Sequence, residues 1–138
     1  MRQAQHLRSR GYSLVELLIV LVIAGILATL AYPSYAAQIQ KGRRADAMAA
    51  LYQVQQAQER WRANHASYAG DLASLGLGGL GSARYRLAIT ASSAHGYTAT
   101  ASADGPDAAC ATLALVLERG QIVYGSSGSG TSRLCWNR

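Results

Sequence analysis

The first half of the chain carries two successive hydrophobic patterns within one helical signal. Residues 12–32 are apolar on all sides of a helix, and Glu16 is their one carboxylate. A helix of this length spans roughly 30 Å, about the thickness of a bilayer's hydrocarbon core. Further on, apolar residues recur every three or four positions, which predicts an amphipathic helix. Pro33 is expected to kink the helix without ending it, so one helix is predicted over residues 12–63. The apolar stripe consists of Ala47, Ala50, Leu51, Val54, Ala57 and Trp61.

The second half of the chain alternates between apolar and polar positions in short runs. Residues 85–90, 97–101 and 111–117 are predicted strands, and residues 121–124 are a fourth strand at an edge. The run 111–117 is the most hydrophobic and is predicted to be central. Short connections favour an antiparallel meander whose inner face covers the helix stripe. The fold class is therefore α+β, with the direction of the threonines in 97–101 left open.

The connections between these elements are rich in turn-forming residues. Residues 71–75 are predicted to form one helical turn with Asp71 as its N-cap. The glycines of 76–81 predict a flexible connector, and residues 104–107 predict a plain turn. The Gly/Ser-rich run 125–132 is expected to be mobile because it has no means of burying surface.

The charge balance is less basic than it first looks. The chain of 138 residues has 13 Lys and Arg against 7 Asp and Glu, a net charge of +6. Residues 1–11 hold three of the arginines, so the remainder has 10 cations against 7 anions, or +3. The three arginines favour a cytoplasmic N-terminus. The mild positive remainder leaves nucleic acid open as a partner, although no motif supports it.

Cys110 and Cys135 both lie beyond the apolar run. If that run directs the chain outward, they meet an oxidising compartment and are expected to pair. A disulfide closing such a loop contributes roughly 3 kcal/mol to stability. The alternative is a pair of free buried thiols.

No catalytic or metal-binding pattern is found. His6 belongs to the basic N-terminal segment, and His65 and His95 fall in predicted turns without other ligands at metal-binding spacing. Asp104 and Asp107 are too few for a calcium loop. No enzyme activity, metal or cofactor is therefore predicted. The basic residues of 41–44 are expected to meet lipid headgroups or neighbouring subunits, or to form a solvated face.

The N-terminal residues resemble the prepilin processing motif of type IV pilins. A short basic segment ends at Gly11, Tyr12 stands where the family usually has Phe, and Glu16 falls at the fifth mature position. Gly25 and Pro33 also fall where the family often has helix-loosening residues. The C-terminal pattern around Cys110 and Cys135-Trp136 is similar to that of PilE-type minor pilins.

This resemblance implies a type IV pilin fold, with a long helix packed on a small antiparallel sheet and a disulfide-bounded C-terminal region. It implies a cleaved leader of residues 1–11, a membrane and filament-core helix of residues 12–35, and a periplasmic and later extracellular head of residues 36–138. The implied function is that of a minor type IV pilin, a structural or priming subunit in pilus assembly, with adhesion and twitching motility.

The resemblance also implies partners and roles for particular residues. A prepilin peptidase would cleave after Gly11 and methylate the new N-terminus at Tyr12. The inner membrane would store the subunit until the membrane assembly machinery adds it to other pilin subunits. In a filament, Glu16 would be buried and would pair with the Tyr12 amino group of a neighbour, while Gly25 and Pro33 would let the helix loosen between them. The alternative for Glu16 is a solvated carboxylate near the membrane face.

Three alternatives remain at this stage. An ordinary signal peptide with a cleavage site after Ser34-Tyr35-Ala36 would leave Ala37 as the first residue. A pseudopilin of a type II secretion system shares the same N-terminal signal. A DNA-uptake or adhesive pilin would use its positive head for binding, and this alternative predicts one exposed stripe that contains Arg84, Arg86, Arg119 and Arg133.

Overall fold

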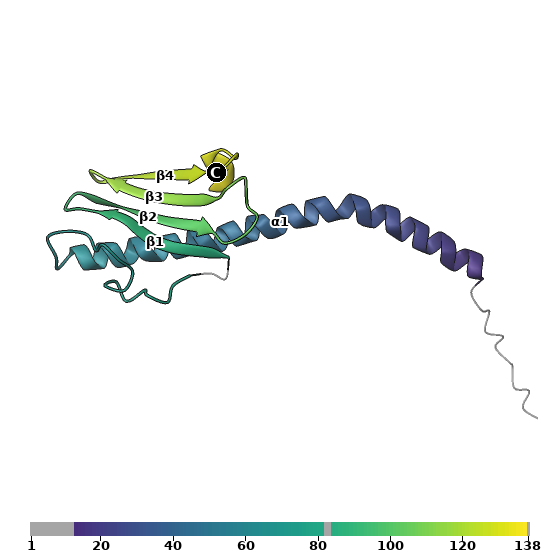
Figure 1. Cartoon of the computed structure of the whole chain (residues 1–138), viewed down its shortest axis with the longest axis horizontal. Helices are drawn as coiled ribbons and strands as arrows, with labels where there is room; N and C mark the ends of the chain where they lie inside the picture. Colours follow the sequence, from purple (N-terminus) through teal and green to yellow (C-terminus); the bar gives the residue numbers. More distant parts are fainter. Residues whose placement is uncertain (1–12, 82–83, 138) are drawn as a thin grey trace, which may run out of the picture. The chain divides into compact units, whose positions relative to one another are not determined.

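The computed structural model describes residues 13–81 and 84–137. The chain divides into two compact units, Met1–Ala37 and Gln38–Arg138, which are described separately below. The long helix predicted from the sequence is α1, and the four predicted strands follow in an antiparallel sheet (Figure 1). The elements are α1 (Leu14–Arg62), β1 (Tyr85–Ser92), β2 (Gly96–Ala103), β3 (Thr112–Glu118), β4 (Gln121–Ser127) and α2 (Ser132–Cys135).

The described part of the first unit, residues 13–37, is helical from Leu14 onward and apolar on every side. Large apolar side chains between Leu14 and Leu30 are each at least 50 % exposed. Pro33 lies inside α1 and does not end it, as the sequence predicted. Among the described residues, α1 is the one helix long and apolar enough to cross a membrane. This surface needs a cover because exposed apolar area of this extent is costly in water.

Two hydroxyl groups in this first unit, those of Thr29 and Ser34, are satisfied within the helix. Thr29 Oγ1 donates to the Ile26 carbonyl at 2.7 Å, and Ser34 Oγ donates to the Ala31 carbonyl at 3.0 Å. Such bonds lower the cost of placing a hydroxyl in a lipid environment, where water is absent. Among the described residues, no such hydrogen bond within the helix is found for the Glu16 carboxylate, and its side chain is exposed.

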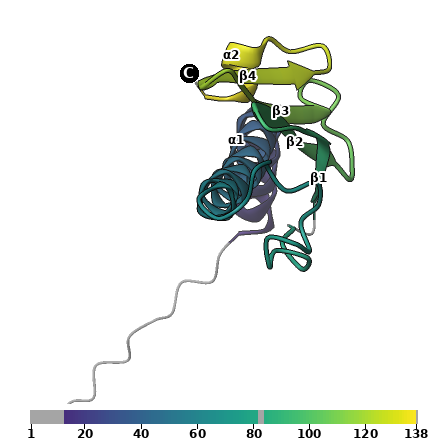
Figure 2. The same cartoon turned by 90° about the vertical axis from the view of Figure 1, so that its left-hand side faces the viewer.

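In the second unit, the later part of α1 lies against the inner face of the sheet (Figure 2). The predicted stripe is buried at Ala47, Ala50, Leu51, Val54 and Ala57. From the sheet, Leu113 and Leu115 complete the core and are fully buried. Several contact positions are alanines, which have little side chain to keep helix and sheet apart.

The sheet has the strand order β1-β2-β3-β4, with every neighbouring pair antiparallel. β3 is therefore interior and β4 is an edge strand, as predicted. Tyr97, Ala99 and Ala101 of β2 face inward, so Thr98 and Thr100 face outward, which the sequence had left open. β3 and β4 join through the two-residue turn Arg119-Gly120, where both residues have positive φ, 52° and 80°. Such a turn matches the natural twist of a hairpin.

The connector between α1 and β1 is held in place by leucines and by Gln58. Leu72, Leu75, Leu77 and Leu80 are half-buried against the core, so the glycines between them do not make a free linker. The fully buried Gln58 amide binds both backbone groups of Ala69, accepting from its N–H at 2.9 Å and donating to its carbonyl at 2.8 Å. The 71–75 turn is not a helix, but Asp71 Oδ1 accepts from the Ser74 N–H as an N-cap would.

Trp61 is the member of the predicted stripe that does not join the core. Its ring is half-buried and stacks on the ring of His65, with centroids 3.7 Å apart and planes 3° apart. His65 Nδ1 also lies 2.9 Å from the Trp61 carbonyl, near the end of α1. The exposed-turn expectation for His65 is confirmed, while the expectation that the sheet covers Trp61 is wrong.

Candidate functional site

The second unit is tied together at one end by a largely buried ion pair between α1 and the loop that joins β2 to β3. Arg44 donates from Nε and Nη2 to the two carboxylate oxygens of Asp107, each at 2.8 Å. Tyr85 at the start of β1 donates its hydroxyl to Asp107 Oδ2 at 3.0 Å, and the Cys110 N–H donates to Oδ1 at 3.2 Å. One carboxylate thus joins the helix, the first strand and the disulfide.

This arrangement perturbs all three titrating groups. The hydrogen bonds from Arg44 hold the pKa of Asp107 below its ordinary value, although burial opposes this shift. The same hydrogen bonding raises the pKa of Arg44, again against burial. Burial, followed by the bond to Asp107, raises the pKa of Tyr85 to about 12. Residues 104–106 do bend between β2 and β3, as predicted. The ion pair of Asp107 was not predicted, because its partner Arg44 lies 63 positions away in the chain.

The C-terminal region is closed by the predicted disulfide between Cys110 and Cys135, both fully buried. The expected mobility of residues 125–132 is not found. Residues 125–127 belong to β4, and the N–H groups of Ser129 and Gly130 donate to the carbonyls of Ala108 and Ala109 at 3.0 and 2.8 Å. Gly128 has a φ of +125°, and a Cβ there would lie 2.5 Å from the Ala109 carbonyl oxygen. Glycine permits this close approach, so the composition reflects backbone packing rather than flexibility.

An aromatic cluster fixes the end of the chain against α1 and β4. Trp136 is 3 % exposed and donates its indole N–H to the Gly125 carbonyl at 2.7 Å. Its ring meets Tyr52 and Tyr124 edge-on, with centroids 6.4 and 4.7 Å apart. The expected C-terminal apolar anchor is thus Trp136, whereas Leu134 is exposed.

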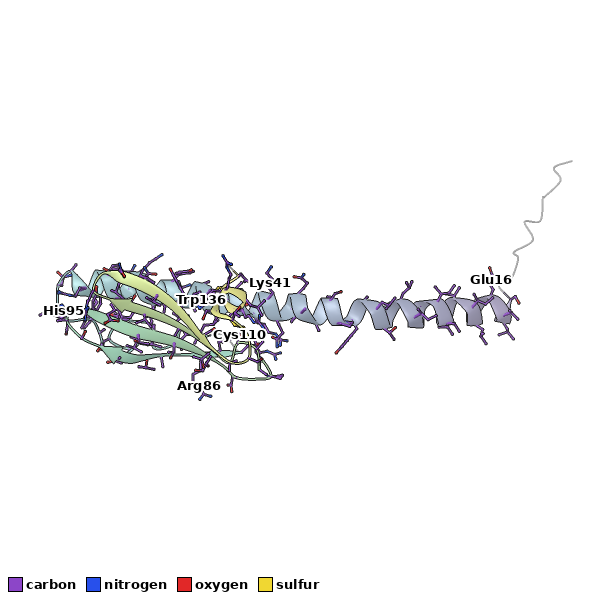
Figure 3. All side chains as sticks on the ribbon, turned by 90° about the horizontal axis from the view of Figure 1, so that it is seen from above. Glu16, Lys41, Arg86, His95, Cys110 and Trp136 are labelled. Carbon is purple, nitrogen blue, oxygen red and sulfur yellow. A yellow bond between two sulfur atoms is a disulfide. The ribbon has the colours of Figure 1, made fainter. Side chains whose placement is uncertain are left out.

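The four arginines proposed as one basic stripe are divided between the two ends of the sheet, three at one end and Arg119 at the other. Arg84 and Arg86 lie at the start of edge strand β1, and Arg133 lies on α2, which follows the opposite edge strand β4. Arg119 occupies the β3–β4 turn at the other end of the strands. Figure 3 shows the same two ends, with Arg86, Lys41, Cys110 and Trp136 toward one and His95 at the other. The expected single stripe is therefore wrong.

A different polar arrangement crosses the outer face of the sheet. The strand register places Arg86, Ser102, Thr112 and Ser127 side by side, one on each strand. We call these four residues the hydroxyl row. Ser102 Oγ and Thr112 Oγ1 lie 3.5 Å apart. Arg86 and Asp104 approach to 3.5 Å with both side chains largely exposed, which makes a weak ion pair. Sequence reasoning missed this row because it depends on the register of four strands.

The other predicted site residues belong to the range of the first unit, residues 1–37. Glu16, Gly25 and Pro33 all lie in α1, and a Cβ added at Gly25 would have no neighbour within 4 Å. Gly11 and Tyr12 lie outside the described residues. Within the described part of the chain, no group of three His, Cys, Asp or Glu side chains is arranged to hold a metal ion.

Two family models match the chain. The model of the prokaryotic N-terminal methylation motif matches residues 6–32. The model of the type IV minor pilin ComP, described as a DNA uptake sequence receptor, matches residues 33–114, which is more than half of the chain. The chain belongs to the type IV minor pilin ComP family. Searches of curated proteins and of solved structures gave no match.

Membership in this family confirms the expected minor type IV pilin and its fold. The N-terminal helix anchors the minor pilin in the inner membrane with its head in the periplasm, and the assembled subunit is part of the extracellular pilus. The cysteine pattern resembled minor pilins in general terms, and the family model identifies ComP among them. The ComP match ends at residue 114, so β4, α2 and Cys135 lie beyond it.

The Asp107 ion pair gives a pH-dependent prediction. Asp107→Asn should lower the free energy of unfolding of the second unit by about 2–4 kcal/mol at pH 7, because Arg44 would lose its counter-charge in a largely buried position. Since the folded pKa of Asp107 is lowered, this stabilisation is complete above about pH 4 and is lost as pH falls through that lowered pKa. Urea unfolding of the detergent-solubilised chain, followed by near-UV circular dichroism from pH 7 to pH 2, measures it.

The matched control for this prediction is Asp104→Asn, which removes the exposed partner of Arg86 and should cause no measurable loss. An equal loss in both variants, or a loss that does not change with pH, would contradict the role assigned to Asp107.

Proposed function

We propose that this minor pilin is the DNA-binding subunit of a pilus that takes up DNA. The observation that carries the proposal is the family match over residues 33–114, whose description names a DNA uptake sequence receptor. This replaces the more general structural or priming role as the most specific function. A type II secretion pseudopilin is disfavoured by the same match, and no catalytic role is proposed.

The hydroxyl row supports a DNA contact on the outer face of the sheet. Arginine guanidinium groups and Ser or Thr hydroxyls are among the groups that bind DNA phosphates. Neighbouring strands are about 4.8 Å apart, so a row across four strands extends over roughly 14 Å. One DNA strand presents a phosphate about every 3.4 Å along the axis, so the row can follow several of them. The weak Arg86–Asp104 pair leaves Arg86 free to exchange its partner for a phosphate.

The ends of the row carry further positive charge. Arg84 precedes β1 next to Arg86, and Arg133 lies in α2 just after β4; both are exposed. Ser132, the neighbour of Arg133, accepts from Ser126 of β4 at 3.1 Å, which holds α2 to the end of that strand. The disulfide and the Gly128 contact fix the same segment. The proposed surface is therefore rigid, which reduces the entropy lost when DNA binds.

Assembly and processing residues complete the proposed function. Cleavage after Gly11 and methylation of Tyr12 by the prepilin peptidase would produce the mature subunit, and the inner-membrane machinery would add it to other pilins. In the filament Glu16 would pair with the amino group of Tyr12 in a neighbour, and Gly25 and Pro33 would loosen the helix between them. Adhesion and twitching motility remain family-level expectations without support from a particular residue.

The proposed Glu16 pairing gives a prediction about pilus assembly. Glu16→Gln should keep membrane insertion, since an amide costs less to bury than a charge, and should keep cleavage after Gly11. Its content in sheared pili should fall, because a neighbour's buried ammonium without a counter-charge costs ~3 kcal/mol or more. Quantitative immunoblots of membranes and sheared pili measure both steps. Glu118→Gln, an exposed carboxylate at the end of β3, is the control. A normal amount of the Glu16 variant in pili would contradict the pairing and indicate that Glu16 is only a solvated carboxylate.

The proposed DNA surface gives a prediction about DNA binding. Arg86→Gln and Arg133→Gln should each weaken binding of a labelled duplex. Each should also make the log–log salt dependence shallower by about 1, as expected for one lost phosphate contact. Fluorescence anisotropy of the detergent-solubilised chain at several salt concentrations measures both quantities.

Arg60→Gln serves as the control because Arg60 is exposed near the end of α1, away from the hydroxyl row. Equal weakening by Arg60→Gln would show that only net charge matters, against the proposed surface. Absence of DNA binding by the unchanged chain would contradict the proposed function itself.

A further inference from the structure

The basic residues just beyond the apolar run of α1 differ sharply in what they contact. Arg44 is engaged by Asp107 through two hydrogen bonds, and its side chain is 11 % exposed. Lys41 is exposed, whereas Arg43 is half-buried and makes one long hydrogen bond, 3.4 Å, to Gln40 of the same helix. Neither of the two ion pairs found among the described residues includes Lys41 or Arg43. We call these two residues the basal pair.

The basal pair comes shortly after the apolar run in the sequence, on the side where lipid headgroups are expected. Tyr32 and Tyr35 are exposed on α1, and tyrosines gather where a membrane meets water. Lys41 follows Tyr35 by six positions in the sequence. The headgroup zone is about 5–8 Å deep on each side of the hydrocarbon core. Lys and Arg side chains can extend back toward a membrane along their apolar stems, which favours contact between their charges and this zone.

The charge of the basal pair is unusual for this side of the membrane. Positive residues next to a membrane helix normally mark the cytoplasmic side, yet the head that carries the basal pair is periplasmic. The first carboxylate after the apolar run is Asp46, so two unpaired cations come before any local anion. Such a placement is stabilised if anionic groups in the adjacent leaflet neutralise the cations.

We propose that Lys41 and Arg43 bind the phosphate groups of anionic phospholipids in the outer leaflet of the inner membrane while the subunit is stored there. The group that the two cations would bind is the phosphate monoanion of a lipid at the bilayer surface, not a phosphate of DNA. Gly42 stands between the two cations, and a Cβ there would meet nothing within 4 Å, so no other part of the head covers α1 at that position. Lys41 and Arg43 point to different sides of the helix, so each would contact a lipid of its own. The contact is independent of the DNA surface proposed above.

The test uses the full chain in bilayers and compares how strongly it selects spin-labelled phosphatidylglycerol over phosphatidylcholine. The unchanged chain should prefer phosphatidylglycerol. The double variant Lys41→Gln/Arg43→Gln should lose this preference by about fivefold for each cation, the ratio expected for ~1 kcal/mol per charge at an anionic surface. For the unchanged chain, the preference should also disappear near 1 M salt, where charges are screened beyond about 3 Å.

The matched control is Arg60→Gln/Arg119→Gln, which removes two exposed cations from positions far along the second unit and leaves the same net charge. All variants keep the same N-terminal arginines, so their contribution cancels. Unchanged lipid preference in the basal variant, or an equal loss in the control, would overturn the proposal. So would weaker duplex DNA binding in phosphatidylcholine bilayers with the lipid preference intact, because the basal pair would then be a nucleic-acid contact.

Discussion

The apolar surface of the first unit is the constraint on which the behaviour of this minor pilin depends. From Leu14 onward the helix exposes large aliphatic side chains on all sides, and nothing within the described residues covers them. Only a bilayer or closely packed neighbouring helices can do so. A membrane can hold the helix because its backbone groups are paired within it and the Thr29 and Ser34 hydroxyls bond to its carbonyls. A filament accepts it by replacing lipid with other helices. The same surface therefore requires two successive environments, and Glu16 is the one charged position that the two would treat differently.

The head solves a different problem, which is stability from a small core. Its helix–sheet contact relies on alanines as well as on Leu51, Val54, Leu113 and Leu115, so each contact buries little apolar area. The head adds ties of other kinds. The disulfide closes the C-terminal region, Asp107 joins α1 to β1 and to Cys110, and Gln58 holds the connector at Ala69. These ties lie around the sheet rather than across its outer face, so that face stays free for a partner.

The features predicted well from the sequence are those that depend on local periodicity. The helix, the four strands and the central position of β3 follow from spacing and hydrophobicity, and the disulfide follows from compartment. The features missed depend on partners far away in the chain. The sequence around Asp107 indicates only a turn, and the structure adds its ion pair with Arg44. The Gly/Ser run reads as a mobile loop until Ala108 and Ala109 bind it. The basic stripe failed because arginine spacing in the sequence says nothing about which edge of a sheet each residue reaches.

Processing at the N-terminus decides whether the apolar helix stays with the head, and the whole account of storage and assembly rests on that outcome. The most direct measurement is the intact mass of the mature chain, with the N-terminal peptide sequenced by tandem mass spectrometry. The account predicts a chain that begins at Tyr12, carries an N-methyl group and retains the complete helix. A mature chain that begins at Ala37 would contradict it, because the head would then be released from the membrane without the segment needed to join a pilus.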